Sequence, residues 1–118
     1  MARQSLRRQV DFDRVFANGR RRKTAPLTVI VAPRPEANSP ARLGVIVSKR
    51  VSRLAVVRNR VRRRVREAFR ALQPQMITDA DVIVIAHRPL IEYDYWAIKA
   101  QLQEALTRLG MAGDGSGG

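Results

Sequence analysis

The chain of 118 residues has no cysteine and a single histidine, His87. The lack of cysteine excludes disulfides and thiolate metal sites. No carboxylate cluster surrounds His87 in the sequence, which predicts a loop residue there and neither a metal ligand nor a general base. The acidic residues are scattered, with no pair suited to two-metal hydrolysis, and neither a glycine-rich phosphate loop nor a Ser-His-Asp arrangement is found. We therefore predict no catalytic residue and no metal ligand.

Long apolar runs are also missing. None approaches the roughly 18 residues of a membrane span. The opening stretch MARQSLRRQVDF is charged and lacks the apolar region of a signal peptide. These absences predict a cytoplasmic protein that contacts no membrane. Because 45% of the residues are hydrophobic, the chain can still bury the single core of one ordinary domain.

The chain has a large excess of positive charge, +13 overall. Residues 1–70 hold 20 basic and 4 acidic side chains, whereas residues 71–118 hold 3 and 6. Twenty of the 23 basic residues are arginine, whose planar fork matches phosphate and stays charged at any working pH. Such a gathered set of arginines indicates a polyanion-binding site, and it favours holding phosphates over catalysing their transfer.

The densest basic cluster is the stretch VVRNRVRRRVREAFR, Val56 to Arg70. Seven of its last thirteen residues are arginine, and their mutual repulsion calls for an anionic partner. A merely solvated face would mix Glu with Lys, and a membrane-surface helix would have a Trp or Leu belt. At 100° per residue the apolar side chains fall within about 120°, which predicts a helix with a packed back and an arginine-covered front. That apolar stripe consists of Val57, Val61, Val65, Ala68, Phe69 and Leu72.

Turn signals and residue periodicity divide the rest of the chain into short elements. The expected order is a helix over 11–18 capped by Asp11, a basic loop or edge strand over 19–26, strands over 27–32, 43–51 and 81–86, and a helix over 94–109 ended by Gly110. Strand 43–51 is apolar almost throughout and is expected at the centre of the sheet. We expect one domain, 1–110, followed by a flexible Gly-rich tail, 111–118.

Two aromatic residues, Phe12 and Phe16, lie four positions apart and so share a face of the first helix. Two interpretations remain open at this point. The pair either packs in the core or forms a platform on which unpaired bases stack. From its residues alone, the chain is thus predicted to be a compact α/β RNA-binding protein.

Two stretches resemble the bacterial ribonuclease P protein subunit. LGVIVSKR followed by AVVRNRVRRRVREAFR is similar to the family's R-x-G-x-x-V-S-K-K stretch, R-N-R helix and closing R-E-x-F-R. DFDRVF at 11–16 is similar to its D-F-x-x-V-F, with Gly19 where a glycine follows. The chain departs from the pattern at 52–56, where SRLAV replaces a shorter G-N-A-V, and at Ile30, where the family often has a small or aromatic residue.

The resemblance implies an α+β fold, a single small α-β-β-β-α-β-α sandwich with a central, mostly antiparallel sheet. It places the R-N-R helix in an unusual left-handed βαβ crossover. It also implies one subunit of an endoribonuclease holoenzyme, in which the RNA subunit uses Mg²⁺ to remove the 5′ leader from precursor tRNA. The protein would bind that RNA 1:1 and bind the leader as well, without being catalytic itself and without a tightly bound cofactor.

Two surfaces follow from the resemblance, residue by residue. For Asn59 the role is open among bonding RNA directly, orienting its neighbours and capping the helix. The surface for the RNA subunit consists of Ser48, Lys49, Arg50, Arg58, Asn59, Arg60, Arg62, Arg63, Arg66 and Arg70. The surface for the leader consists of Phe12, Phe16, Val29, Val31 and Arg88.

Two other classes of protein remain as alternatives. A ribosomal or ribosome-assembly protein would share the charge and the arginine helix. A self-sufficient nuclease would cut RNA without an RNA subunit, and the missing carboxylate or histidine constellation argues against it. Reconstitution with a ribonuclease P RNA and a leader-bearing tRNA separates the three.

Overall fold

The structure is a computed structural model that describes residues 6, 8–34, 40–75 and 80–111. The order of its helices and strands confirms the α-β-β-β-α-β-α arrangement that the resemblance implies. No helix among these residues is long and apolar enough to cross a membrane. The elements are α1 (Gln9–Asn18), β1 (Arg20–Lys23), β2 (Leu27–Pro33), β3 (Arg42–Ile46), α2 (Ala55–Leu72), η1 (Gln73–Gln75), β4 (Ala80–Ala86), η2 (Arg88–Glu92) and α3 (Tyr95–Arg108).

The four strands form one sheet in the order β1-β2-β4-β3. The β1–β2 and β2–β4 pairs are antiparallel, and β3–β4 is parallel, so the sheet is mostly antiparallel as expected. The chain passes from β3 to its parallel neighbour β4 through α2. The left-handed sense of this crossover stays a prediction.

The prediction that the strand beginning near residue 43 lies at the centre of the sheet is wrong, since β3 is an edge strand. It also ends at Ile46, and the residues that follow form a turn. Its apolar sequence has another cause: α2 and α3 cover one face of the sheet and α1 covers part of the other, so even an edge strand has side chains to bury on both sides. Val47 and Val51, beyond the strand, continue that burial as part of the larger core.

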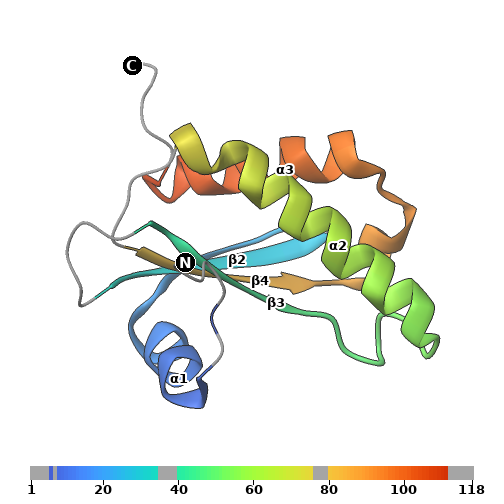
Figure 1. Ribbon diagram of the computed structural model, residues 1–118, viewed down its shortest axis with the longest axis horizontal. Coiled ribbons are helices and arrows are strands. Elements are labelled where there is room, and N and C mark those ends of the chain that lie inside the picture. Colours follow the sequence, from blue (N-terminus) through green and yellow to red (C-terminus); the bar gives the residue numbers. More distant parts are fainter. Residues whose placement is uncertain (1–5, 7, 35–39, 76–79, 112–118) are drawn as a thin grey trace.

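Figure 1 shows the two layers of helix, with α2 and α3 over one face of the sheet and α1 under one end of the other. The larger core lies between the sheet and the α2–α3 pair. Side chains alternate between the faces of a strand, and Val29 and Val31 point into this larger core, where they are 0% and 5% exposed. The prediction that these two valines line a binding surface is therefore wrong. Their neighbours Ile30 and Ala32 face α1 instead.

Helix α2 confirms the predicted stripe. Val61, Val65, Ala68, Phe69 and Leu72 are buried. Val57, in the first turn of the helix, is half-buried. The sequence period thus fixed which side of α2 meets the core.

Helix α1 is held on the sheet by the buried carboxylate of Asp81, which is 0% exposed. Arg42 of β3 donates to it from Nε and Nη2, both at 2.8 Å, and Arg14 of α1 donates from Nη2. Arg14 also donates to the carbonyl oxygen of Pro33 at 2.7 Å. The carboxylate of Asp81 therefore links α1, β3 and β4, and Arg14 also connects α1 to the end of β2.

The predicted cap of the first helix is wrong. The helix begins at Gln9, with Arg8 at the N-cap position and no side-chain cap. Asp11 lies inside the first turn, where a negative charge is favourable near the helix N-terminus. There it forms ion pairs with Arg14 at 3.6 Å and Arg42 at 3.5 Å. Its interactions thus reach the Asp81 cluster.

The last helix agrees with its prediction. Asp94 is the N-cap, and its Oδ1 accepts from the backbone N–H of Ala97 at 2.8 Å. Gly110, just after the helix, has φ of 78°, a conformation that suits glycine. Met111 is buried in the larger core. The remainder of the predicted tail, 112–118, lies outside the described residues.

Close packing of α1 on the sheet requires a residue without a side chain at Gly44. A Cβ there would lie 2.7 Å from Cζ and 2.8 Å from Cε1 of Phe12. We expect Gly44→Ala to lower the free energy of unfolding by about 1–3 kcal/mol, as overpacking does. The measurement is urea denaturation of both proteins.

The same substitution should cost less in a Phe12→Leu background, because the shorter side chain leaves room for the new methyl group. A double-mutant cycle measures that coupling. Strictly additive effects of the two substitutions would contradict the contact as the cause.

Candidate nucleic-acid interface

The solvent side of α2 presents exposed arginines. Arg63, Arg66 and Arg70 are exposed and make no hydrogen bond or ion pair with the residues that the structure describes. Their planar forks are therefore open to outside acceptors. Three uncompensated guanidinium groups on one helix face repel each other, and phosphate groups would relieve that repulsion.

A second set of arginines on α2 is directed at the protein's own backbone. Arg58 donates through Nη1 to the carbonyl oxygens of Ser52 and Arg53, both at 2.9 Å. Arg62 donates through Nη2 to the carbonyl oxygen of Val47 at 3.3 Å. These contacts fasten the connection between β3 and α2 to the helix. Both arginines were predicted for RNA, and part of their donor capacity is already engaged.

The opposite edge of α2 faces the segment before α3. Arg64 donates through Nη1 to the carbonyl oxygen of Tyr93 at 3.0 Å. Arg60 is half-buried, and its Nε is buried without a hydrogen-bond partner in the described part of the chain. Each guanidinium has five N–H donors, so both arginines keep donors for a ligand.

Asn59 has a defined structural role. Its Oδ1 accepts from Nη1 of Arg62 at 2.9 Å. The helix begins at Ala55 with Leu54 at the N-cap, so the helix-capping alternative is wrong. Orientation of a neighbour is the alternative that this hydrogen bond supports, and the exposed amide still has its N–H groups for RNA.

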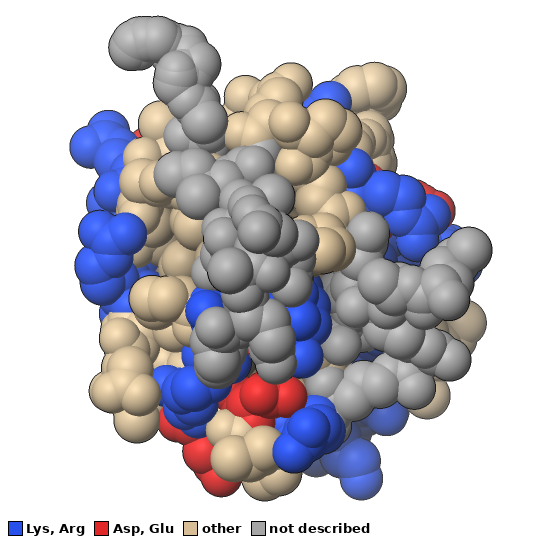
Figure 2. Space-filling model, turned by 60° about the vertical axis from the view of Figure 1, so that its left-hand side comes forward, with Lys and Arg blue, Asp and Glu red and all other residues tan. Residues whose placement is uncertain are grey.

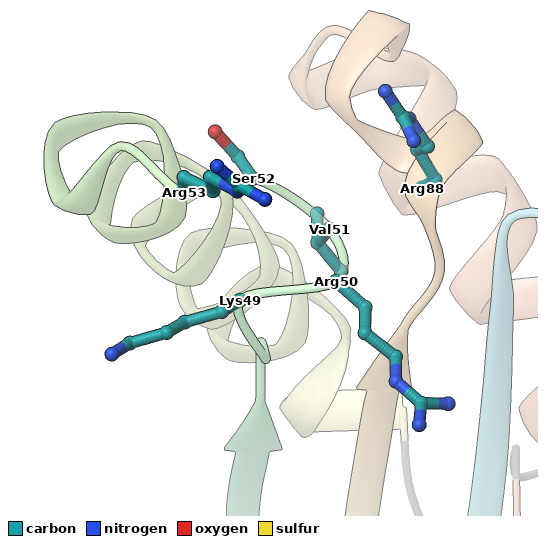
Figure 3. A pocket seen from close by; sticks show the side chains of 6 residues that line it. All are labelled: Lys49, Arg50, Val51, Ser52, Arg53 and Arg88. Atoms are coloured by element: carbon teal, nitrogen blue, oxygen red, sulfur yellow. The ribbon is translucent and has the colours of Figure 1, made fainter.

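A basic hollow of about 850 Å³ lies beside the start of α2. Figure 3 shows Arg88 projecting from η2 opposite the turn that holds Arg53. Four cations thus border one space, which suits an anionic ligand. Arg88 was predicted with the leader surface, and the structure groups it with residues predicted for the RNA subunit. The hollow is lined by Lys49, Arg50, Val51, Ser52, Arg53 and Arg88.

Two serines shape the turn that borders this hollow. Oγ of Ser48 accepts from the backbone N–H of Arg50 at 3.2 Å. Oγ of Ser52 accepts from the backbone N–H of Leu54 at 3.1 Å. Such local side-chain bonds stabilise turns. They hold the connection that leads from β3 into α2.

The other face of the sheet is only partly covered, because α1 lies under one end of it (Figure 1). Phe12 is half-buried and packs against the smaller core together with Ile46 and Ile85, which are themselves only partly buried. Phe16 is 37% exposed. The structure therefore separates the two aromatic residues: Phe12 packs on the sheet, whereas Phe16 offers part of its ring to solvent. We call the part of this face at Ile46 and Ile85, together with the exposed ring of Phe16 on α1, the open half.

A polar contact that no sequence pattern indicated lies at the end of this face. Nε2 of His87 and Oγ1 of Thr28 are 2.7 Å apart. Burial, and then the charge of Lys23, lower the pKa of His87, so the neutral imidazole is favoured. His87 lies between β4 and η2, as predicted for a loop residue. Among the described residues no group of three or more His, Cys, Asp or Glu side chains could hold a metal ion.

Basic side chains are not confined to α2. On the face shown in Figure 2, they flank the acidic patch low in the view and spread along both sides. Fold and surface together define a small basic α+β protein of the nucleic-acid-binding class.

Comparisons with known proteins make the identification specific. Residues 1–110 match the family model Ribonuclease P. The chain is 41% identical over 107 residues to the ribonuclease P protein component of Roseiflexus castenholzii, covering 90% of this chain and 85% of that one. For the same component of Desulfovibrio desulfuricans the values are 37% over 106 residues, 88% and 81%. The chain belongs to the ribonuclease P protein family, as the sequence motifs predict.

Solved structures agree with this assignment. A Staphylococcus aureus RNase P protein mutant with defective mRNA degradation activity superposes with a TM-score of 0.82 at 26% identity, covering 92% of this chain and 89% of that one. The RNase P protein from Thermotoga maritima gives 0.78 at 27% identity, with 90% and 97% covered. The α+β fold is therefore that of the family.

The two sets of arginines on α2 should behave differently when truncated. Neutralising roughly 5–8 phosphates gives a log–log salt slope of about −4 to −7 for RNA binding. Arg63→Ala should flatten that slope by about one unit, because one phosphate contact is lost. Thermal unfolding should be unchanged, since the side chain is exposed and makes no hydrogen bond or ion pair with the described residues. A salt titration of binding to a structured RNA provides the measurement.

Arg58→Ala is the matched control on the same helix. It removes two hydrogen bonds to backbone carbonyls, so we expect about 1–2 kcal/mol of lost folding stability. Equal melting temperatures for the two variants would contradict this division of the arginines.

Proposed function

We propose that this protein is the subunit of ribonuclease P that binds the catalytic RNA through α2 and the basic hollow, and the 5′ leader of precursor tRNA through the open half of the sheet. In this role it assists the endonucleolytic removal of the leader. The observation that carries the proposal is the combination of two features: exposed arginines on α2 that have no partner among the described residues, and an exposed aromatic residue, Phe16, on the α1 side of the sheet. Relatives named ribonuclease P protein component support it.

Recognition of the RNA subunit rests on charge held in a fixed geometry. The apolar stripe of α2 fixes the helix on the core, so its outward arginines are presented without a large cost in backbone order. Each phosphate contact releases counterions, which favours association. The hollow adds four cations beside the start of the same helix, which extends the proposed contact beyond α2 itself.

Recognition of the leader rests on stacking. A single-stranded segment has unpaired bases, and any base can stack on an aromatic ring. Phe16 is exposed enough to serve, with Ile46 and Ile85 as partly buried apolar residues of the same face. Mature tRNA has no leader, so this surface should contribute to substrate binding only.

In this proposal bond cleavage belongs to the RNA subunit, and a Mg²⁺ ion held there would supply the activated water and the charge stabilisation that phosphodiester hydrolysis requires. The described residues of the protein do not fit a catalytic metal ion. Its buried carboxylate, Asp81, already accepts hydrogen bonds from Arg14 and Arg42. The protein's own part is to hold two RNA molecules together against their repulsion. We propose a 1:1 complex with the RNA in the cytoplasm.

Reconstitution tests the proposal directly. The purified protein, a bacterial ribonuclease P RNA and a leader-bearing tRNA are combined at limiting Mg²⁺, and 5′ cleavage is followed. We expect the protein to stimulate cleavage by the RNA and to cut nothing alone. RNA binding without stimulation would favour a ribosomal or assembly protein. Cleavage by the protein alone after nuclease removal of contaminating RNA would show that the chemistry was assigned to the wrong subunit.

Phe16→Ala should weaken binding of precursor tRNA while leaving mature tRNA nearly unaffected. Stacking one base is worth on the order of 1–3 kcal/mol, so the loss on precursor should be roughly 5- to 100-fold. Binding titrations of both tRNAs to the reconstituted holoenzyme measure the difference. Unchanged discrimination in a variant that melts like the parent would remove Phe16 from the leader surface.

Phe12→Ala is the control for this variant. Phe12 packs on Gly44, so its truncation should lower folding stability, toward the low end of the roughly 3–5 kcal/mol of core Phe→Ala changes. A fall in melting temperature for Phe12→Ala and not for Phe16→Ala distinguishes packing from stacking.

A further inference from the structure

Strand β1 consists of four consecutive basic residues, and pleating sends them to opposite faces of the sheet. In register with β2, Arg20 pairs with Val31 and Arg22 with Val29, positions that face α2 and α3. Arg21 pairs with Ile30 and Lys23 with Thr28, positions on the α1 face. Residues paired across two strands share a face. The run RRRK is therefore two pairs of cations with different surroundings.

The pair on the helical face is engaged within the protein. Arg20 donates through Nη2 to the carbonyl oxygen of Leu109 at the end of α3. Arg22 forms an ion pair with Glu104 of α3 at 3.6 Å. These contacts tie the edge of the sheet to the last helix, which gives this pair a structural role.

The pair on the α1 face has no such partner. Arg21 and Lys23 are exposed and form no hydrogen bond or ion pair with the part of the chain that is described. Lys23 pairs with Thr28 across β1 and β2, and Oγ1 of Thr28 is 2.7 Å from Nε2 of His87, which places Lys23 beside the His87–Thr28 contact. Two unpaired cations therefore border the open half of the sheet at its β1 edge.

The course of α1 relates these cations to the aromatic residues. The ring of Phe12 lies against Gly44 of β3, at one edge of the sheet. The helix then runs through Phe16 to Gly19, and the next residue begins β1 at the opposite edge. With neighbouring strands about 4.8 Å apart, the line from β3 to β1 covers on the order of 14 Å. A strand of RNA that follows α1 past Phe16 would next meet β1.

We infer that Arg21 and Lys23 bind backbone phosphates of the leader beyond the nucleotide at Phe16, so that single-stranded RNA crosses the whole width of the sheet. This inference rests on the proposed function and adds to it the far end of the leader site. A simpler account is that charges on an edge strand block unwanted strand pairing. That account explains positive charge on β1, but it assigns Arg21 and Lys23 no role in binding the leader.

The test uses the reconstituted holoenzyme and precursor tRNAs whose leaders are lengthened one nucleotide at a time. We compare the parent with the double variant Arg21→Gln and Lys23→Gln, which keeps a polar edge. For long leaders, loss of two phosphate contacts should flatten the log–log salt slope by about 1.4, from roughly 0.7 per contact on a single strand. Short leaders and mature tRNA should bind the variant as they bind the parent.

Two matched variants complete the design. Arg20→Gln with Arg22→Gln removes the same charge from the other face, and should lower the melting temperature without changing the dependence on leader length. Arg21→Lys with Lys23→Arg keeps both charges and should restore the parental slope. Equal loss on long leaders, short leaders and mature tRNA, or no loss at all, would overturn the inference. A parent protein that fails to stimulate cleavage would instead overturn the proposed function.

Discussion

The arrangement of the molecule depends on one buried carboxylate. Asp81 is fully buried at the start of β4, with Arg14 and Arg42 as hydrogen-bond donors and Nε of Arg34 3.8 Å from its Oδ1. Removing one partner of a buried ion pair typically costs 3–5 kcal/mol, because it leaves an uncompensated charge. The cluster fixes α1 at one end of the sheet, and the exposure of the other end follows from that position. A structural interaction thus sets the boundary of the proposed leader site.

The same chain has to fold with a net charge of +13. The helical period of α2 and the strand period of β1 direct some of its cations into the protein and others toward solvent. In α2 the helical period turns Arg58 and Arg62 toward backbone carbonyls and Arg63 toward solvent, and in β1 the strand period separates Arg20 from Arg21. The cations directed into the protein have hydrogen-bond acceptors, whereas those directed toward solvent still repel one another. A ligand that binds only the folded state stabilises it by mass action, so a polyanion would stabilise this protein as it binds.

The sequence predicted helix α2 better than it predicted strand β2. Helix α2 and the side that packs on the core were predicted, because its apolar residues occupy one stripe, but the contacts of Arg58 and Arg62 with backbone carbonyls were not. Strand β2 was located, but the faces of its residues were not, because LTVIVA is apolar at nearly every position and both faces are buried. Val29 and Val31 were assigned to the leader surface through the resemblance, and the pattern of this strand offered no alternation that would have contradicted the assignment. The buried position of Asp81 could not be predicted. An acidic residue at the start of a strand is also typical of a turn, and the arginine partners of Asp81 are distant in sequence.

The R-N-R signature, residues 58–60, together with Arg62 just after it, has a structural role besides supplying charge. Arg58 and Arg62 lie four residues apart on one side of α2, and both hold the β3–α2 connection by its carbonyl oxygens. Asn59 orients Arg62 from within the motif. The connection that they hold presents the cations of the basic hollow. A lysine in place of Arg62 would keep the charge but lose the planar fork, whose Nη1 and Nη2 reach Oδ1 of Asn59 and the carbonyl oxygen of Val47 at once. The same arginines thus hold the turn in place and supply positive charge on the helix. This double role favours arginine over lysine at these positions.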